Sequence, residues 1–171
     1  MKLKILIVLL ITSSVAQSQQ FKFNNDATSA PILVEVQGMK ASELYSKAIN
    51  WANTYYKNPE IVIKAKVENE MIRIEAIEKS AFFRTIKDGN VKAEYDVAYT
   101  LTLEFQDGKY RASYQHDRLT DKVYFTIADV FNNIADTNNN GWDGSKESYE
   151  ATVQKLLDRL KDYITKPKEK W

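Results

Sequence analysis

The sequence predicts an α+β domain, with a single curved antiparallel sheet and two main helices packed on one of its faces. Two kinds of periodicity support this fold class. Apolar residues occupy every odd position from Val91 to Phe105, and polar residues all the even ones but Ala98, which is typical of a half-buried strand. Residues 42–57 and 146–164 instead repeat apolar residues at helical spacing. The expected element order is β-α-β-β-β-β-α.

The composition is typical of a soluble globular protein. Of the 171 residues, 44% are hydrophobic and 27% charged, with only 5 Gly and 3 Pro, which excludes disordered, collagenous and multi-span membrane proteins. The chain has no Cys, which excludes disulfides, thiolate nucleophiles, zinc–thiolate and iron–sulfur sites and a lipid-modified cysteine. A single His excludes a histidine-rich metal centre.

The first 16 residues are typical of a secretory signal peptide. Two lysines precede an apolar run from Ile5 to Ile11, and small residues follow up to Ala16. We expect cleavage after Ala16 or, as the alternative, after Ser18. The apolar run is too short to span a bilayer, which takes about 20 residues. We therefore expect an exported protein without a membrane span in its mature chain, located in the periplasm, at the outer membrane or outside the cell.

The charge balance bears on the partners. Removal of residues 1–16 takes away two lysines and no acid, so the formal net charge changes from +1 to 1 − 2 = −1. A surface that binds nucleic acid needs an excess of Lys and Arg. The sequence therefore predicts no nucleic-acid partner and favours a protein or another component of the cell envelope.

The N-terminal half begins with a polar segment. Residues 17–31 are polar and aperiodic, which predicts a flexible N-terminal lead-in. A single domain is expected from residue 32 to residue 165 (32–165). Its first strand is the apolar run 32–36, and the helix 42–57 follows, with Ser42 as its N-cap and an Asn-Pro pair at its end.

Four strands are expected next. Alternating apolar residues over 61–67 and 72–76 predict a hairpin, and the alternation breaks at Ala76-Ile77, which indicates a bulge or a strand end. Asp88-Gly89 is the turn before the long alternating strand. Asp107-Gly108 then supplies a type I′ turn, which fixes the register of the last two strands. The expected pairs are Gln106 with Lys109, Phe105 with Tyr110, Leu103 with Ala112, and Leu101 with Tyr114.

The C-terminal part is helical. Apolar residues recur at helical spacing over 127–134, a polar loop covers 136–144, and the helix 146–164 closes the domain. Residues 166–171 form a basic C-terminal tail.

Taken together, these elements resemble a known family. The strand that closes at Gly38, the helix SELYSKAINWANTYY with Trp51, and the long strand leading into FQDGKYRASY are similar to a domain of unknown function with a TATA-binding-protein-like (TBP-like) fold, found in exported Bacteroidetes proteins. The resemblance covers residues 31–118 and depends most on Asp107 to Arg111 and on the Trp51 helix. It implies a fold and an export route but no activity. The nucleic-acid function of the fold's namesake is not implied, because a fold does not determine a function.

One motif in the polar loop points to a metal. The calcium-loop pattern D-x-[DN]-x-[DN]-G-x5-E is matched by Asp136, Asn138, Asn140, Gly141 and Glu147. The carbonyl oxygen of Trp142 would complete the ligands, although only two of the ligands carry charge and Asp143 stands where an apolar residue is usual. The alternative is an Asn/Gly-rich turn without an ion, in which Ser145 caps the last helix. We commit to no cofactor and keep calcium at this loop as a hypothesis.

A second candidate is His116-Asp117-Arg118, where the single imidazole stands beside a carboxylate and could serve as a general base. The hairpin register places His116 opposite Tyr99, at the end of a core-facing row. The sequence therefore favours a structural or exposed histidine over a catalytic one.

The long strand has two distinct faces. One row of aromatic side chains is either a stacking platform for sugars or bases or, as we favour, core beneath the helices; it consists of Tyr95, Tyr99, Tyr110 and Tyr114. The opposite row is either solvated or a docking surface, and its mixed charges favour a solvated face; it consists of Lys92, Glu94, Asp96, Thr100, Thr102 and Glu104.

The motifs do not indicate an enzyme class, because the sequence contains no recognisable nucleophile–base pair, phosphate loop or dense metal cluster. The leading hypothesis is a non-enzymatic binding or interaction domain of the cell envelope, with its open sheet or long loop as the binding surface. Two alternatives are a carboxylate-based hydrolase, which needs only two acids on one cleft wall, and a structural or assembly-accessory subunit of a surface complex.

Overall fold

The computed structural model describes residues 20–86, 91–120, 125–135 and 141–166. The predicted signal peptide, the Asp88-Gly89 turn and most of the basic tail lie outside the described residues. The helices and strands, in chain order, are β1 (Ile32–Glu35), α1 (Ala41–Tyr55), α2 (Pro59–Val62), β2 (Ile63–Val67), β3 (Met71–Ile86), β4 (Val91–Gln106), β5 (Lys109–Leu119), α3 (Ile127–Ala135) and α4 (Ser145–Thr165).

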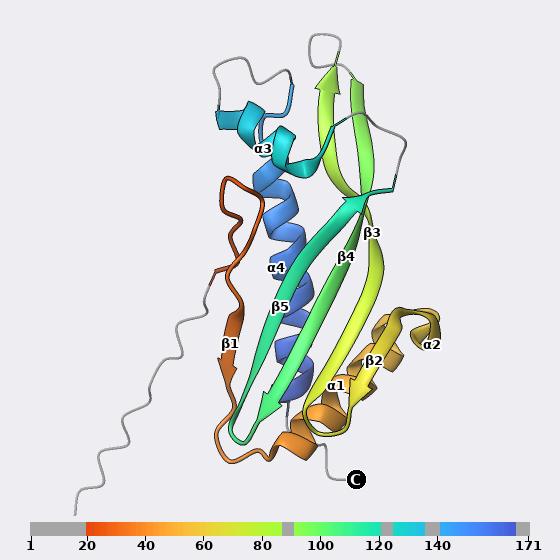
Figure 1. The fold of residues 1–171 in the computed structure, drawn as a ribbon, viewed down its shortest axis with the longest axis vertical. Helices are drawn as coiled ribbons and strands as arrows, with labels where there is room; N and C mark the ends of the chain where they lie inside the picture. Colours follow the sequence, from red (N-terminus) through yellow and green to blue (C-terminus); the bar gives the residue numbers. More distant parts are fainter. Residues whose placement is uncertain (1–19, 87–90, 121–124, 136–140, 167–171) are drawn as a thin grey trace, which may run out of the picture.

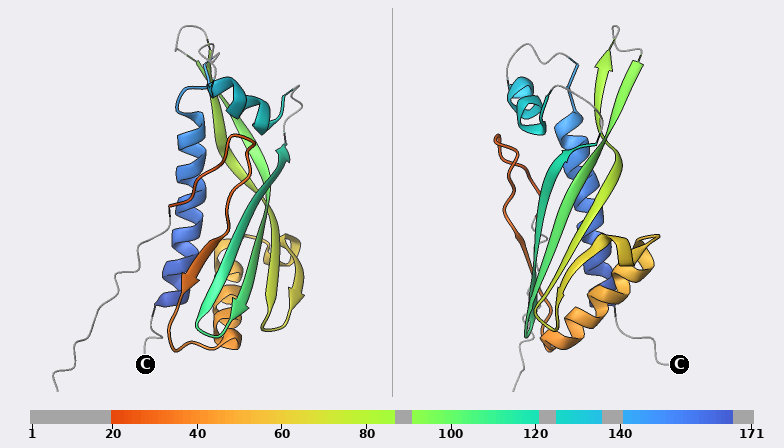
Figure 2. Two further views of the ribbon diagram at one scale, coloured as in Figure 1. Left: turned by 60° about the vertical axis from the view of Figure 1, so that its left-hand side comes forward. Right: turned by 45° about the vertical axis from the view of Figure 1, so that its right-hand side comes forward.

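Five strands form one antiparallel sheet in the order β1-β5-β4-β3-β2. Helices α1 and α4 lie behind this twisted sheet in Figure 1, and the opposite face is turned toward the viewer. Figure 2 shows α4 running along the length of the sheet and α1 near its lower end. The predicted α+β class with two main helices on one face is therefore confirmed. The helical spacing over 127–134 corresponds to α3, and the short helix α2 was not predicted. None of the described helices is both long and apolar enough to cross a membrane.

The register of the β4–β5 hairpin is the one predicted from its Asp-Gly turn. As a result the odd-numbered residues of β4 point to the core, and Tyr99, Leu101 and Leu103 are at most 1% exposed. These side chains meet the buried sides of the two main helices. The buried apolar residues of these helices are Leu44, Ala48, Trp51 and Ala52 in α1 and Tyr149, Val153, Leu156, Leu157, Leu160 and Ile164 in α4.

The break in alternation within β3 is a bulge. The pairing shifts between Glu78, which lies opposite Val97, and Phe82, which lies opposite Tyr95. Residues 79–81 of β3 therefore face Asp96 alone, two residues more than a regular ladder would place there. The Asp96 carboxylate accepts hydrogen bonds from the backbone N–H of Ser80 at 3.0 Å and from the ammonium group of Lys79. The predicted bulge is therefore confirmed, and it lies a few residues later than the break in the pattern.

The N-terminal lead-in is a correction to the sequence prediction. From Gln20 onward it is packed on the domain, and Phe21 and Phe23 are only 2% and 5% exposed. An antiparallel bridge joins Phe23 to Ser29. Two aromatic side chains in an otherwise polar segment carry no periodicity, and so the pattern gave no sign that they are buried.

Two further boundaries differ from the prediction. Helix α1 begins at Ala41, so Ser42 lies inside the helix and is not its N-cap. Residues Pro59–Val62 form the short helix α2, and β2 therefore begins at Ile63 rather than at Ile61. A proline at the first position of a helix is already restricted to a helical φ, which explains why this run is not a strand.

Candidate functional site

One face of the sheet is left uncovered by α1 and α4, and we call it the open face. Its side chains alternate along each strand with those of the core. The strand pairing assigns to it Leu33 and Glu35 of β1, Lys109, Arg111, Ser113 and Gln115 of β5, Thr100, Thr102 and Glu104 of β4, Met71, Arg73, Glu75 and Ile77 of β3, and Ala65 and Val67 of β2. Thr100, Thr102 and Glu104 belong to the row of β4 that was predicted to be either a solvated face or a docking surface, and they lie on the open face.

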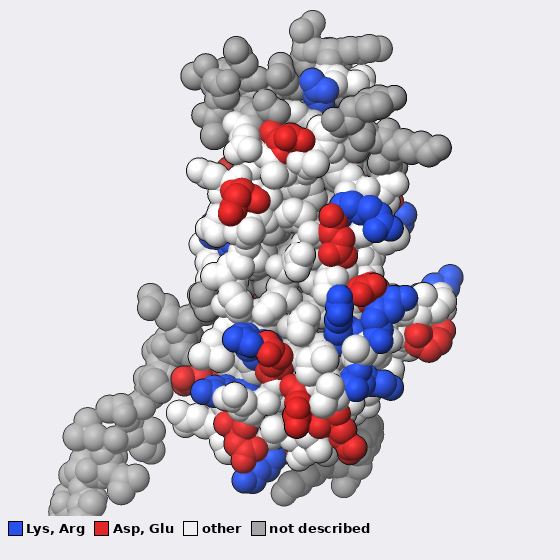
Figure 3. All heavy atoms as spheres, in the orientation of Figure 1, with Lys and Arg blue, Asp and Glu red and all other residues white. Residues whose placement is uncertain are grey.

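The open face carries charges of both signs in balance. In the set just defined, three basic side chains, Arg73, Lys109 and Arg111, stand against three acidic ones. Figure 3 shows blue and red groups interspersed over the lower half of this face, with uncharged surface between them. A balanced surface of this kind lacks the excess positive potential that attracts a phosphate backbone.

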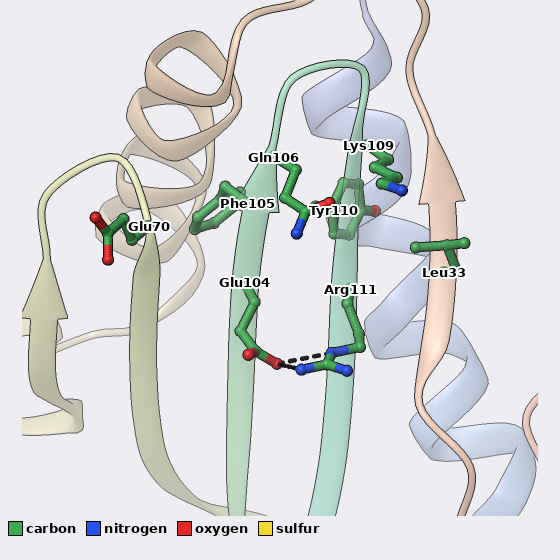
Figure 4. Close-up of a pocket in the computed structure, with 8 residues that line it drawn as sticks. All are labelled: Leu33, Glu70, Glu104, Phe105, Gln106, Lys109, Tyr110 and Arg111. Carbon is green, nitrogen blue, oxygen red and sulfur yellow. Dashed lines mark hydrogen bonds and ion pairs between the residues drawn. The ribbon is translucent and has the colours of Figure 1, made fainter.

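A groove of about 470 Å³ lies on the open face beside the β4–β5 turn (Figure 4). Its lining residues are Leu33, Glu70, Glu104, Phe105, Gln106, Lys109, Tyr110 and Arg111. Inside it the guanidinium of Arg111 donates to Oε2 of Glu104, at 2.8 Å from Nε and 2.6 Å from Nη2. Both side chains are about half exposed, so this ion pair contributes little to stability and instead orders two charged groups at the surface.

Isolated aliphatic side chains also stand on the open face. Leu33 pairs with Arg111 across β1 and β5 and is 50% exposed, while Ile77 and Val67 are 52% and 44% exposed. Together with the hydroxyl groups of β4 and β5 they give a surface of scattered apolar, hydroxyl and charged groups. This mixture is similar to the composition of transient protein–protein interfaces.

The aromatic row predicted to be core packs into the core and does not form a stacking platform, although Tyr95 at its end is only partly buried, against Phe125 and Trp142. Tyr99, Tyr110 and Tyr114 are at most 5% exposed. Two pairs of phenol oxygens join the sheet to the helices, Tyr56 with Tyr99 at 2.9 Å and Tyr114 with Tyr149 at 3.0 Å. Burial raises the pKa of all four phenols, so they stay neutral donors and acceptors within the core.

Sequence reasoning missed Glu78. It occupies a core-facing position of β3, just before the bulge, and is half-buried. Burial raises the pKa of its carboxyl group, and the positive charge of Arg159 on α4 partly opposes this shift. Burial also raises the pKa of Tyr55, with Glu78 adding to the shift, and the guanidinium of Arg159 lies 5.9 Å from the Tyr55 ring centre. The sequence signal that could have identified Glu78 is its even position in β3, in phase with the core residues Ile72 and Ile74.

The structure does not form the general-base pair suggested by His116 and Asp117. Nδ1 of His116 is buried without a hydrogen-bond partner, and its ring contacts Phe23 with 5.7 Å between centroids. Burial lowers the pKa of His116, and the nearby Asp117 opposes this shift. The Asp117 carboxylate instead accepts a hydrogen bond from the hydroxyl of Thr100 at 3.1 Å. This arrangement fits the structural histidine favoured by the sequence.

The calcium motif falls partly outside the described residues, which exclude Asp136, Asn138 and Asn140. Gly141 adjoins β3, where its carbonyl accepts the N–H of Thr85 at 2.7 Å, and a Cβ on it would lie 1.9 Å from the Thr85 carbonyl oxygen. The side chain of Trp142 is 4% exposed and its carbonyl accepts the N–H of Ser145 at 3.0 Å. Glu147 lines a groove beside the N-terminal segment. Calcium at this loop stays a prediction.

The start of α4 corrects one detail of the turn hypothesis. Ser145 is the first residue of the helix and is fully buried, and the preceding Gly144 adopts a left-handed conformation. The hydroxyl oxygen of Ser145 accepts the backbone N–H of Phe83 at 3.2 Å, so it binds β3 rather than capping its own helix. Across the part of the chain that the structure describes, no three His, Asp or Glu side chains cluster in a way that would hold a metal ion.

Comparisons with known proteins agree with this fold. Residues 33–118 match the model of a family described as a domain of unknown function (DUF4468) with a TBP-like fold. A solved TBP-like protein from Parabacteroides distasonis is 20% identical, with a TM-score of 0.56 over 81% of this chain and 93% of that one. A solved DUF4468 family protein from Bacteroides ovatus is 12% identical, with a TM-score of 0.58 over 84% and 90%. At these identities the likeness concerns the fold alone. No curated protein matches the chain.

Proposed function

The chain belongs to the DUF4468 family with a TBP-like fold, and on that premise we propose that it is a non-enzymatic binding domain of the cell envelope which holds a protein partner on its open face. The observation that carries the proposal is the asymmetry of the sheet. One face is buried under α1 and α4, whereas the other carries a groove, an ordered ion pair and separated aliphatic side chains. A face of this size and composition fits a protein surface better than a small molecule.

The chemistry of the open face supports a protein over the other partner classes. Its charges balance, which disfavours nucleic acid. The Glu104–Arg111 pair can exchange hydrogen bonds with polar groups of a partner, and Leu33 beside it offers apolar area to bury. A protein partner can make both the polar contacts and the apolar contact in one interface.

The hydrolase alternative has less support. Glu78 is a half-buried carboxyl group with a raised pKa, as a general acid would need. The charged group that acts on its pKa is the basic Arg159, whereas a glycoside hydrolase needs a second carboxylate across the cleft. A half-buried carboxyl group near the positive charge of Arg159 is not a pair of catalytic carboxylates.

The envelope location rests on the predicted signal peptide. The proposal includes export with cleavage after Ala16, or after Ser18, and a mature chain in the periplasm, at the outer membrane or outside the cell. Mass spectrometry of the native protein checks this part separately. An intact segment from Met1 to Ala16 in the native protein would contradict export through cleavage.

Binding on the open face is tested by capture of partners from the native envelope with matched variants. Ile77→Glu places a charge on the open face, and Ile61→Glu places the same charge in α2, outside that face; the two isoleucines are 52% and 59% exposed. We expect both variants to fold with unchanged Tm, since exposed substitutions have small effects on stability. The Ile61 variant should retain the partner of the unmodified chain, and the Ile77 variant should lose it.

Two results decide between the hypotheses. Retention of the same partner by both variants would overturn the open face as the binding surface. Co-purification in a fixed ratio with a surface complex, lost in the Ile77 variant, would identify the partner as that complex and favour the accessory-subunit alternative.

A further inference from the structure

The described N-terminal segment, residues 20–29, lies against α4, α3 and β5, and we call it the strap. Figures 1 and 2 show it as a narrow loop beside the upper half of α4. Its backbone pairs with itself: Phe23 bridges to Ser29, and the N–H of Asn24 donates to the carbonyl of Thr28 at 2.8 Å. It is not a strand of the main sheet.

Helix α4 holds the strap through side chains that recognise its main chain. The backbone N–H of Phe21 donates to Oε1 of Gln154 at 2.6 Å, and the backbone N–H of Phe23 donates to Oε1 of Glu150 at 2.9 Å. The acceptors are four residues apart on one face of a helix, and the donors are two residues apart on an extended chain. This is the geometry of a receptor for an extended peptide.

The residue between the two phenylalanines supplies charge. The ammonium group of Lys22 donates to Oε2 of Glu150 at 2.7 Å, so the carboxylate binds both a side chain and a backbone amide of the strap. The Glu150 side chain is 6% exposed, whereas that of Lys22 is 57% exposed. A buried carboxylate that loses its partners is costly, so this position of α4 requires an occupant with a cation and an amide.

An aromatic cage receives the two rings. The ring of Phe23 lies 5.0 Å from that of Tyr149, 5.5 Å from that of Phe131 and 5.7 Å from that of His116, between ring centres. The ring of Phe21 meets that of Tyr114 edge-on at 5.7 Å. The cage walls come from β5, α3 and α4.

We propose that α4, α3 and β5 form a receptor for an extended peptide segment with the pattern aromatic–basic–aromatic, and that the strap fills this receptor within its own chain until a partner's segment replaces it. The contacts with α4, α3 and β5 described above are all made by Phe21, Lys22 and Phe23, and none of them requires a covalent link to β1. The site is separate from the open face.

A partner's segment has contacts available that compensate for the advantage of an attached strap. A groove of about 480 Å³ runs from the start of the strap along α4, lined there by Glu147, Ala151, Lys155 and Asp158. An attached segment has a local concentration on the order of millimolar, so a free peptide of equal length competes poorly. A longer segment that continues along this groove adds contacts on α4 and thereby replaces the strap.

The test uses the full chain and a fluorescent peptide with the strap sequence QFKFNNDATS. In the double variant Phe21→Ala/Phe23→Ala the attached strap no longer fills the cage, while the receptor is unchanged. We expect the peptide to bind this variant at least about tenfold more tightly than it binds the unmodified chain, because the attached competitor is removed. Peptide binding should also raise the Tm of the variant toward that of the unmodified chain. The control peptide QAKANNDATS should do neither.

A second variant covers the case in which the double variant does not fold. Lys22→Glu keeps both rings and places a like charge beside Glu150, which loosens the strap through an exposed side chain. It should also bind the peptide more tightly than the unmodified chain does. Absence of peptide binding to a folded variant, or equal binding of the control peptide, overturns the proposal. Concentration-dependent dimers of the unmodified chain would assign the site to the strap of a second copy and overturn its assignment to a partner.

Discussion

Asp107, in the turn between β4 and β5, caps helix α1: its Oδ1 accepts the backbone N–H of Ala41 at 2.9 Å, and its Oδ2 accepts from the ammonium group of Lys40 at 3.1 Å. The same turn is tied to the loop before the helix, since the N–H of Gly108 donates to the carbonyl of Met39 at 2.8 Å. One aspartate therefore serves both a hairpin turn and a helix start that lies 66 residues earlier in the chain.

The Asp107 cap predicts a pH-dependent effect. The N–H of Ala41 and then the ammonium group of Lys40 lower the pKa of Asp107 below its usual 3.8, so the unfolded state binds the proton more readily and the cap stabilises the fold above that pH. Asp107→Asn should lower Tm at pH 7 and lose less stability than the unmodified chain as the pH falls through 3.8. Lys40→Gln, which leaves the amide contact intact, should change Tm less. Equal losses in the two variants would assign the effect to the exposed ion pair.

The β4–β5 register predicts opposite outcomes at adjacent residues. Leu101 is fully buried and Thr102 lies on the open face. Leu101→Asp should unfold the domain for two reasons. The loss of the core side chain costs about 2–5 kcal/mol, and the burial of an unpaired charge adds a further penalty. Thr102→Asp should stay within about 0.5 kcal/mol. Thermal unfolding followed by circular dichroism measures both, and equal Tm values would contradict the register.

Lys47 links the two main helices, and its substitution should therefore lower the stability of the domain. Its side chain leaves α1 and donates to the carbonyl oxygens of Ile164 and Lys166, both at 2.7 Å, at the C-terminal end of α4. Lys47→Met keeps most of the apolar side chain and removes the donor, which should cost about 1–3 kcal/mol because two carbonyls lose a charged donor. Urea unfolding gives the value. Lys155→Met, on the exposed side of α4, is the control and should change stability by less than about 0.5 kcal/mol.

His116 predicts destabilisation in mild acid. Burial lowers its pKa below the usual 6.5, so the unfolded chain takes up the proton first as the pH falls through 6.5, and the free energy of unfolding decreases until the pH is below the pKa of the folded state. Glu78, whose pKa is raised, has the opposite effect. The difference between His116→Gln and the unmodified chain removes the contribution of Glu78. That difference should shift in favour of the variant between pH 7 and pH 5, and a constant difference would contradict the assignment.

The calcium hypothesis predicts a modest stabilisation. With two charged ligands, Asp136 and Glu147, the Kd should be on the order of 10⁻⁴–10⁻³ M, as in extracellular modules. At 1 mM calcium this adds about 0.4–1.4 kcal/mol to the free energy of unfolding. A chelator should reverse the shift, and Glu147→Gln should abolish it. Absence of any Tm shift at roughly ten times the weakest Kd in that range would assign the loop to an Asn/Gly-rich turn.

The sheet could be predicted because alternation and turn chemistry are local signals. Tyr99, Leu101 and Leu103 follow a period of two, and the Asp-Gly turn sets their partners on β5. The helix boundaries were less accurate, since Ser42 has the side chain of an N-cap whereas Asp107 supplies the capping contact from a distant turn. A contact between distant parts of the chain leaves no mark on the local pattern.

The candidate sites were harder to predict for the same reason. Phe21 and Phe23 lie in a polar segment, and what buries them is a cage of residues more than 80 positions away. Glu78 is in phase with core residues of β3, and this spacing was a local signal. The nearby positive charge of Arg159, however, comes from α4 and could not be predicted from the pattern of β3. The open face was predicted as an alternating row, but the groove beside Leu33 depends on the pairing of β1 with β5.

The bulge between Glu78 and Phe82 limits how the length of this chain can vary among relatives. Three residues of β3 face one residue of β4 there, so β3 holds two residues more than a regular ladder would need. Strand side chains alternate with a period of two. Removal of two residues therefore leaves all the remaining residues on their original faces, whereas removal of one residue exchanges core and surface for the rest of the strand. Relatives aligned to this chain should therefore show two-residue gaps at 79–81 and no one-residue gaps, which makes gap length a way to recognise which of them share this bulge.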